Sequence, residues 1–255
     1  NELAADGTVF QSQWSCSKNK QLGFKNTSPE AGIGNAPDPT LFFPPGDLLV
    51  RNSSDKVRLV ATSWSANWKK GFSFYQFLDK QLDFRRFEMS FIGNAPCRFK
   101  NIAIKPPMVS AELGSFLRTQ DIFITGSEDD PCSNSLIEAL NCGLPAIALR
   151  SGGHRELIGE KGVLFDNSDD LLVCIETLVQ SLDRFKRIPS THSMAAVGNC
   201  YIHFIEEIST RLTTIGSTPK RISPLKWIQF KLLAWWFGIE NKCFKRLFST
   251  KTLIN

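Results

Sequence analysis

Two carboxylates bracket the part of this sequence that is richest in side chains able to do chemistry. Seven residues separate Asp130 from Glu138, and among them stand Ser133, Asn134 and Ser135. Small polar residues favour the first turn of a helix, where free backbone N–H groups and the helix dipole attract phosphate. Glu138, about one turn inside such a helix, could accept hydrogen bonds from the hydroxyls of one sugar ring, and Asp130 from a second. The segment therefore predicts a binding site for phosphate and sugar.

A purely structural interpretation fits the same residues. Ser135-x-x-Glu138 matches a capping box, in which the two side chains satisfy backbone N–H groups at a helix start. On this segment alone, the binding site and the helix cap are equally compatible with the sequence.

Further candidates stand at other predicted strand ends. Lys70 closes the run Ser-Trp-Ser-Ala-Asn-Trp-Lys-Lys before Gly71, and its ammonium could neutralise a diphosphate. The commoner alternative is a solvated lysine pair beside a glycine turn. The backbone at Asn94, and from Ile104 to Pro106, could flank a nucleobase, although each segment taken singly favours an ordinary turn.

Alternating strands and helices must position these residues. Apolar runs of strand length alternate with helical periodicity through 57–182, which predicts an α/β fold with a Rossmann-like, doubly wound parallel sheet. Ligands bind such sheets at the carboxyl ends of the strands, where the candidate residues stand. The expected strands are 8–10, 57–62, 87–93, 102–104, 121–125, 144–149 and 162–165; the expected helices are 12–22, 72–82, 109–118, 135–141, 154–158, 169–182 and 194–212; 25–57 is expected to be a loop.

Composition argues against several other kinds of site. Residues 1–215 hold 22 basic and 24 acidic residues, so this part of the chain is not a nucleic-acid-binding core. The seven cysteines include no CxxC pair, and neither Asp nor His clusters at metal-ligand spacing, so we expect no disulfide framework and no catalytic metal. Without a GxGxxG or GxxxxGK[ST] motif, no permanently bound cofactor is expected.

The C-terminal part of the chain differs from the rest. Residues 216–255 hold eight Lys or Arg and one acidic residue, and aromatic residues are interleaved with the basic ones over 224–248. This composition predicts a helix lying in the headgroup region of an anionic membrane, too short to span it. Docking against a missing domain is the alternative. We expect the protein in the cytoplasm, at the inner face of the membrane where this tail binds.

The motifs taken together resemble the retaining glycosyltransferases of the GT-B architecture, family four (glycosyl transferases group 1). Lys70-Gly71 and the acid-x7-acid loop match, and Glu138–Pro145 matches the family's Glu-Ala-x-x-x-Gly-x-Pro. Gly152–Leu157 is similar to its Gly-Gly-x-x-Glu-Leu, and Asn35-Ala-Pro-Asp to its interdomain Asn-Gly-x-Asp. The resemblance covers 35–182, and the Ser-rich form of the acid loop resembles a subgroup associated with capsule or other surface polysaccharides.

The resemblance implies a division of the chain. Residues 1–34 would end an N-terminal acceptor domain, 35–56 would be the linker, and 57–192 the complete nucleotide-sugar-binding domain. Residues 193–215 would form the C-terminal helix and 216–255 the basic tail. Because the chain begins within a domain, we expect further residues before Asn1 in the natural protein, and donor binding without assured catalysis by this chain alone.

The resemblance also implies roles. Glu138 would bind the ribose hydroxyls and Asp130 the transferred sugar; residues around Ile104 and Pro106 would contact the base. Lys70 and the amides of Ser133, Asn134 and Ser135 would hold the diphosphate. The implied reaction moves a hexose-type sugar from a nucleotide-diphosphate sugar to a hydroxyl of a glycan or lipid-linked acceptor, with retention and without a metal.

Two departures from the family pattern leave alternatives open. Asp130 stands where glutamate is usual, and Ser65 stands five residues before Lys70, where arginine is usual. Lys69 could replace the missing charge. Otherwise the protein would be an inactive, nucleotide-sugar-binding subunit of the same fold. A nucleotide-sugar epimerase is a third possibility, which the acid-x7-acid loop disfavours.

Overall fold

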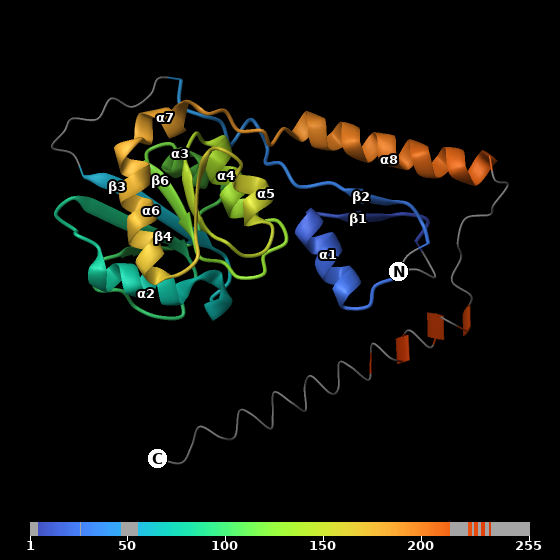
Figure 1. The fold of residues 1–255 in the computed structure, drawn as a ribbon, viewed down its shortest axis with the longest axis horizontal. Coiled ribbons are helices and arrows are strands. Elements are labelled where there is room, and N and C mark those ends of the chain that lie inside the picture. Colours follow the sequence, from blue (N-terminus) through green and yellow to red (C-terminus); the bar gives the residue numbers. More distant parts are fainter. Residues whose placement is uncertain are drawn as a thin grey trace, which may run out of the picture. The chain divides into compact units, whose positions relative to one another are not determined.

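The computed structural model describes residues 5–25, 27–46, 56–214, 224–225, 227–228, 231–232 and 235 (Figure 1). The chain divides into two compact units, one of 1–8, 25–29 and 207–255, the other of 9–24 and 30–206. Most of the predicted tail helix, 224–248, lies outside the described residues. Within the described ranges, every helix is too short or too polar to cross a bilayer. The division at 34 and 56 stays a prediction.

The larger unit is built on a six-stranded, wholly parallel sheet, which confirms the predicted α/β fold. Its order is β5-β4-β3-β6-β7-β8, so the chain starts in the middle, winds outward to one edge, and returns to wind outward to the other. This is the doubly wound order in which ligands bind where the winding reverses, here between β3 and β6. The strands are β3 (Val57–Ser63), β4 (Phe87–Gly93), β5 (Ala103–Lys105), β6 (Ile122–Thr125), β7 (Ala146–Leu149) and β8 (Gly162–Phe165).

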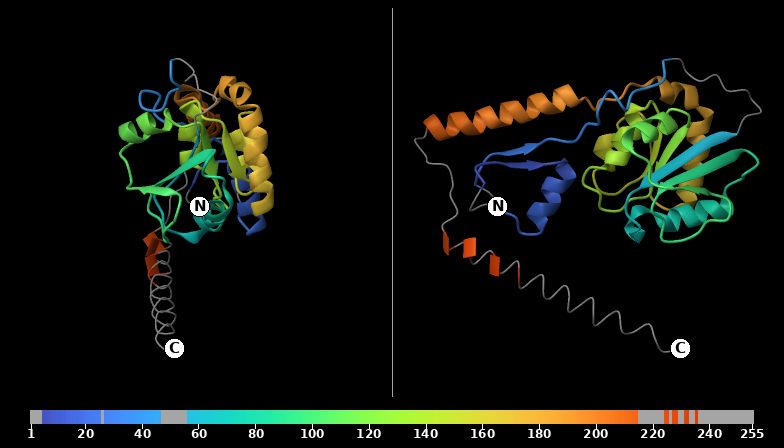
Figure 2. Two further views of the ribbon diagram at one scale, coloured as in Figure 1. Left: turned by 90° about the vertical axis from the view of Figure 1, so that its left-hand side faces the viewer. Right: turned by 180° about the vertical axis from the view of Figure 1, so that it is seen from behind.

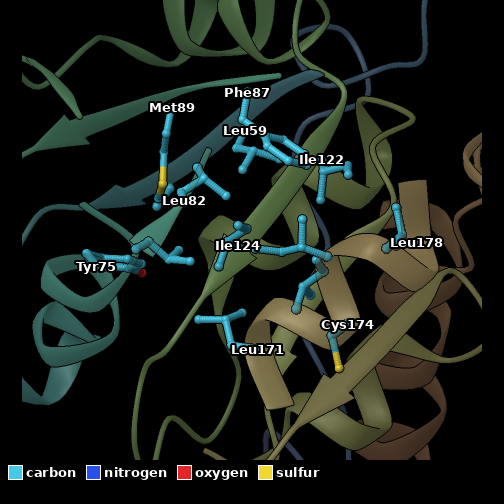
Figure 3. Packing of buried hydrophobic residues seen from close by; sticks show 14 of the residues in the cluster. Leu59, Tyr75, Leu82, Phe87, Met89, Ile122, Ile124, Leu171, Cys174 and Leu178 are labelled. Carbon is cyan, nitrogen blue, oxygen red and sulfur yellow. The ribbon is translucent and has the colours of Figure 1, made fainter. Parts of the chain in front are cut away.

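Helices cover both faces of this sheet. Helices α2 (Phe72–Gln81) and α6 (Ser168–Gln180) bury their apolar sides against one face, and α3 (Ser110–Leu117), α4 (Asn134–Asn141) and α5 (His154–Ile158) against the other. Figure 3 shows the apolar cluster on the face covered by α2 and α6, with Leu59 and Ile124 from the strands facing Leu171 and Leu178 from α6. The sheet is seen from behind in Figure 2, right. Burial on both faces explains why the strands read as continuous apolar runs.

A small two-stranded sheet corrects one prediction. Strands β1 (Thr8–Phe10) and β2 (Glu30–Gly32) pair with each other and are joined through α1 (Gln13–Gln21). Strand β2 lies inside the stretch 25–57, which the sequence predicted as loop. Its three residues have no strand pattern of their own; the pairing with β1, seen in the Ile33 N–H bond to the Phe10 carbonyl at 2.8 Å, orders them.

The remaining differences lie at element ends. The predicted helix 169–182 corresponds to α6 within two residues, and a further helix that was not predicted, α7 (Leu182–Arg187), follows it after Ser181. Helix α7 is held by a buried carboxylate: Asp121 accepts from Lys186 at 2.8 Å and from Arg58 at 3.1 Å. Such a charge is stable in the interior only when it is paired, a constraint that local sequence patterns do not show. Helix α8 runs from Met194 to Thr214.

Candidate functional site

Lys70 and Asp130, sixty positions apart, meet at the point where the sheet reverses its winding. Lys70 ends the short helix η1 (Trp68–Lys70) in the loop after β3, and Asp130 lies in the loop after β6. The Lys70 ammonium donates to Asp130 Oδ2 at 2.9 Å. The Lys70 side chain keeps 37% of its surface exposed, so its ammonium remains accessible to a ligand.

Two glycines allow these loops to approach each other. Gly71 has a φ of +93°, which side-chain-bearing residues rarely adopt, and a Cβ there would lie 2.6 Å from the Cα of Gly126. The backbone of the β3 loop therefore touches that of the β6 loop, and this contact brings Lys70 to Asp130.

The loop after β6 leads into α4, whose first turn carries no side-chain cap. Ser133 is the N-cap residue, but its hydroxyl lies 3.2 Å from the Ser135 hydroxyl and accepts no backbone N–H of the helix. Ser135 is the second helical residue, so Ser135 and Glu138 do not form the capping box that the spacing allowed. The start of α4, with the positive end of the helix dipole, therefore has no side-chain cap, and Ser133, Asn134 and Ser135 line one space with residues of the loops after β3 and β6.

Glu138 lies one turn into α4 and is half-buried. Burial raises the pKa of its carboxyl from 4.5 to about 7. Burial is the sole cause of this shift, and among the described residues the carboxylate has no hydrogen-bonding partner in the protein. A partly desolvated carboxylate without a protein partner gains most from hydroxyl groups that a ligand brings.

Asp130 is fixed in place by several contacts. Its Oδ2 accepts from Ser127 Oγ and its Oδ1 from the Cys132 N–H, each at 3.3 Å, while its backbone carbonyl accepts from the Gly153 N–H at 2.9 Å. The Gly152-Gly153 pair, which the sequence matched to the family's Gly-Gly-x-x-Glu-Leu, thus supports the acidic loop. It also leads into α5, where Glu156 accepts the N–H groups of Gln13 and Trp14, each at 2.8 Å.

A cavity of about 240 Å³ lies between the loops after β3 and β6 and the start of α4. It brings together five of the nine predicted site residues. Glu138 lies outside its lining, one turn further along α4. The lining residues are Thr62, Ser63, Trp64, Ser65, Lys70, Thr125, Ser127, Asp130, Cys132, Ser133, Asn134 and Ser135.

Asn94, Ile104 and Pro106, which were predicted to lie beside a nucleobase, stand at the ends of the neighbouring strands. They line neither this cavity nor a second, apolar space next to it, which we call the slot. Asn94 donates from its side-chain amide to the Trp64 carbonyl at 2.8 Å. Ile104 is 44% exposed and Pro106 is exposed. Pro107 and Met108, immediately after Pro106, line the slot, whose volume is about 10 Å³.

Several residues at or near the cavity, including Trp64, Ser127 and His154, were not among the predicted site residues. Trp64 and Ser127 line the cavity itself, and no local pattern distinguishes them from ordinary loop residues. His154 is fully buried in α5; its Nδ1 lies 2.9 Å from the Leu149 carbonyl oxygen, and burial lowers its pKa. The sequence signal that could have pointed to His154 is its position directly after Gly152-Gly153, the pair that supports the acidic loop. Over the described ranges, no three His, Cys, Asp or Glu side chains are grouped so as to hold a metal ion.

Comparison with known proteins finds a family match in the middle of the chain. Residues 80–181 match the family described as Glycosyl transferases group 1. Over 96 residues the chain is 31% identical to the D-inositol 3-phosphate glycosyltransferase of Paenarthrobacter aurescens (strain TC1). That match covers 35% of this chain and 24% of the relative, so the chain corresponds to about a quarter of that protein.

Solved structures share the fold over a larger part of the chain. HepE of Anabaena in complex with UDP has a TM-score of 0.63 and 18% identity, covering 81% of this chain and 64% of its own. A glycosyltransferase from Rickettsia africae ESF-5 has a TM-score of 0.61 and 18% identity, and the match covers 78% of this chain and 62% of that protein. The sucrose-phosphate synthase of Thermosynechococcus elongatus has a TM-score of 0.58 and 16% identity, and the match covers 84% of this chain and 58% of that protein. The chain therefore shares the fold of these solved structures, and its residues 80–181 are similar to the glycosyl transferases group 1 family.

Proposed function

We propose that this chain is the donor-binding half of a glycosyltransferase that moves a sugar from a nucleotide-diphosphate sugar to an acceptor hydroxyl. The observation that carries the proposal is the meeting of Lys70, Asp130 and the uncapped start of α4 around one cavity at the switch point of the sheet. A cation and free helix N–H groups suit a diphosphate, and a fixed carboxylate beside them suits the hydroxyls of the sugar attached to it.

Each group has a defined part in this proposal. The diphosphate lies against the N–H groups of Ser133, Asn134 and Ser135, and competes with Asp130 for the ammonium of Lys70. Asp130, relieved of that ion pair, accepts from a hydroxyl of the sugar. As the bond between the anomeric carbon and the phosphate oxygen breaks, negative charge grows on the departing diphosphate. Lys70 and the α4 dipole stabilise that charge most strongly at this point, and no metal is required.

We further propose retention of the anomeric configuration, and a part in surface polysaccharide or glycolipid synthesis. Retention rests on the resemblance of the acid-x7-acid loop to that of retaining enzymes. UDP and GDP sugars are the proposed donors, and UDP is the first to test because HepE was solved with UDP and UDP-glucose. Proton NMR of the product formed by the complete protein decides the configuration: a product inverted at the anomeric carbon contradicts retention.

Glu138→Ala tests the donor site directly. We expect the substitution to weaken binding of UDP or GDP, measured by calorimetry, by about 1–3 kcal/mol, because ribose hydroxyls lose a partly buried acceptor. Since burial raises the Glu138 pKa to about 7, the ionised acceptor is a minority below pH 7 and dominant above it. Affinity should therefore rise by about tenfold from pH 6 to pH 8 in the wild type.

The matched control is Glu138→Gln, which keeps the shape of the side chain and cannot ionise. Titration of the ligand's own phosphate is common to both proteins, so the difference between their pH profiles reports Glu138 alone. Identical pH profiles would show that the carboxylate does not contact the ligand. A folded wild type that binds no nucleoside diphosphate or nucleotide sugar contradicts the proposed function altogether.

The tail is proposed to hold the enzyme at an anionic membrane. Among its described residues, Trp227 and Trp235 are 47% and 66% exposed, and the Lys231 ammonium lies 5.0 Å from the centre of the Trp227 ring. Exposed indoles beside lysines suit the headgroup region. We expect removal of 217–255 to abolish co-sedimentation with phosphatidylglycerol vesicles and to spare nucleotide binding. Equal sedimentation of both chains would contradict this assignment.

An inactive donor-binding subunit is the second candidate, and Ser65 is the observation that favours it. The residue lines the cavity where a cation is usual in the family. Lys69 does not supply that charge, since its ammonium lies 3.5 Å from Asp129 and it is not among the lining residues. Nucleotide binding without any sugar transfer by the complete protein would establish this second function.

A further inference from the structure

Trp64 stands out on the described surface because a large aromatic side chain is left in solvent at the edge of the cavity. It is 68% exposed, although it directly follows a strand whose apolar residues are almost wholly buried. An exposed indole next to a cavity is a common feature of sites that bind planar or ring-shaped ligands. Its position at the carboxyl end of β3 places it on the edge of the sheet where ligands bind.

The backbone that carries this indole is held firmly. The Trp64 carbonyl accepts from the Asn94 side-chain amide at 2.8 Å, and the preceding Ser63 carbonyl accepts from the Asn94 N–H at 3.0 Å. On the other side, Ser63 Oγ donates to the Ser65 carbonyl at 2.9 Å. A fixed backbone with an uncovered aromatic side chain is prepared for binding, because little ordering remains to be done when a ligand arrives.

Two spaces of different chemistry meet at this residue. The cavity of about 240 Å³ on one side is lined by Lys70, Asp130 and the start of α4. The slot on the other side is apolar, lined by Ile92, Pro107, Met108 and Leu113 among others. Among the residues that the structure describes, only Thr62, Ser63 and Trp64 line both. A nucleoside diphosphate has the same two-part chemistry, with charged phosphates at one end and a flat, largely apolar base at the other.

We propose that the indole of Trp64 is the stacking surface for the base of the donor nucleotide, and thereby the residue that sets how tightly the nucleotide is held. The inference rests on the proposed function and deepens it. The slot, at about 10 Å³, is too small to enclose a base, so the base lies against the exposed face of the indole. Aromatic stacking is tolerant of base identity, which predicts affinity for both purine and pyrimidine diphosphates.

The test compares variants of Trp64 with matched variants of Trp68. Trp68 belongs to the same loop and is 51% exposed, but its ring packs edge-on against Phe72 at 6.1 Å and lines neither space. Calorimetry with UDP and GDP should show affinity falling by roughly 5- to 100-fold in Trp64→Ala. Affinity should be restored for the most part in Trp64→Phe and unchanged in Trp68→Ala.

Fluorescence gives a second readout that a merely structural tryptophan would not produce. Stacking of the base should quench the indole emission of the wild type; the quench should vanish in Trp64→Phe, which still binds, and persist in Trp68→Phe. Wild-type affinity in Trp64→Ala, or an unchanged quench in Trp64→Phe, overturns the inference while the donor site stands. Absence of nucleotide binding by the folded wild type overturns the proposed function instead, so the two failures are distinguishable.

Discussion

Replacing Lys70 by alanine is expected to lower the rate of sugar transfer by the complete protein about 10²- to 10³-fold. Removal of one preorganised group that stabilises growing negative charge has effects of this size in other enzymes. Lys70 is the cation on the described cavity lining, and its ammonium is already within 2.9 Å of the carboxylate that a diphosphate would replace. The loss should appear chiefly in kcat, since the charge on the departing oxygen is greatest in the transition state.

Lys69→Ala is the matched control, because it removes the same charge from the neighbouring position. The Lys69 side chain is 63% exposed and pairs with Asp129, so its substitution should change the rate by less than about threefold. The rate is followed as release of nucleoside diphosphate in the presence of acceptor. Equal losses in the two variants would mean that general electrostatic attraction, rather than a defined contact of Lys70, holds the donor.

Replacing Gly152 by alanine is expected to destabilise the fold by at least about 3 kcal/mol, as measured by urea unfolding. Its φ of +61° costs any residue with a Cβ about 1–2 kcal/mol. A Cβ at this position would also overlap the carbonyl oxygen of Asp130 and lie 2.7 Å from the Asp130 nitrogen. Backbone atoms cannot rotate away as a side chain does, so the acidic loop itself must shift.

Gly23→Ala separates the cost of the positive φ from the cost of the overlap with Asp130. Gly23 also has a positive φ, +90°, but nothing lies within 4 Å of the position that a Cβ would take. Its substitution should therefore cost only the conformational part, about 1–2 kcal/mol. A shifted loop should also weaken donor binding in Gly152→Ala under conditions where the protein remains folded, whereas Gly23→Ala should bind normally. Equal destabilisation by the two substitutions would contradict the close contact between Gly152 and Asp130.

The sequence by itself determined the elements of the sheet and the composition of the site. Strands of a doubly wound sheet are buried on both faces, so they appear as continuous apolar runs that can be recognised locally, as in β3 and β6. The ligand-binding edge follows from that fold, because loops after parallel strands all meet at one edge. For this reason Lys70 could be predicted as a neighbour of Asp130 and Ser133, although it stands sixty positions before Asp130 in the chain.

Only the tertiary structure decided that one of the two local interpretations of the acidic loop, the capping box, does not apply. The Ser135–Glu138 spacing fits a cap or a binding site; because α4 begins at Asn134, Ser135 lies inside the helix and cannot cap it. Burial by the surrounding chain raises the Glu138 pKa, which no spacing encodes. Trp64 could not be found from local pattern because tryptophans are, on average, largely buried. Its exposure depends on which distant residues fold over it, and that is a property of packing alone.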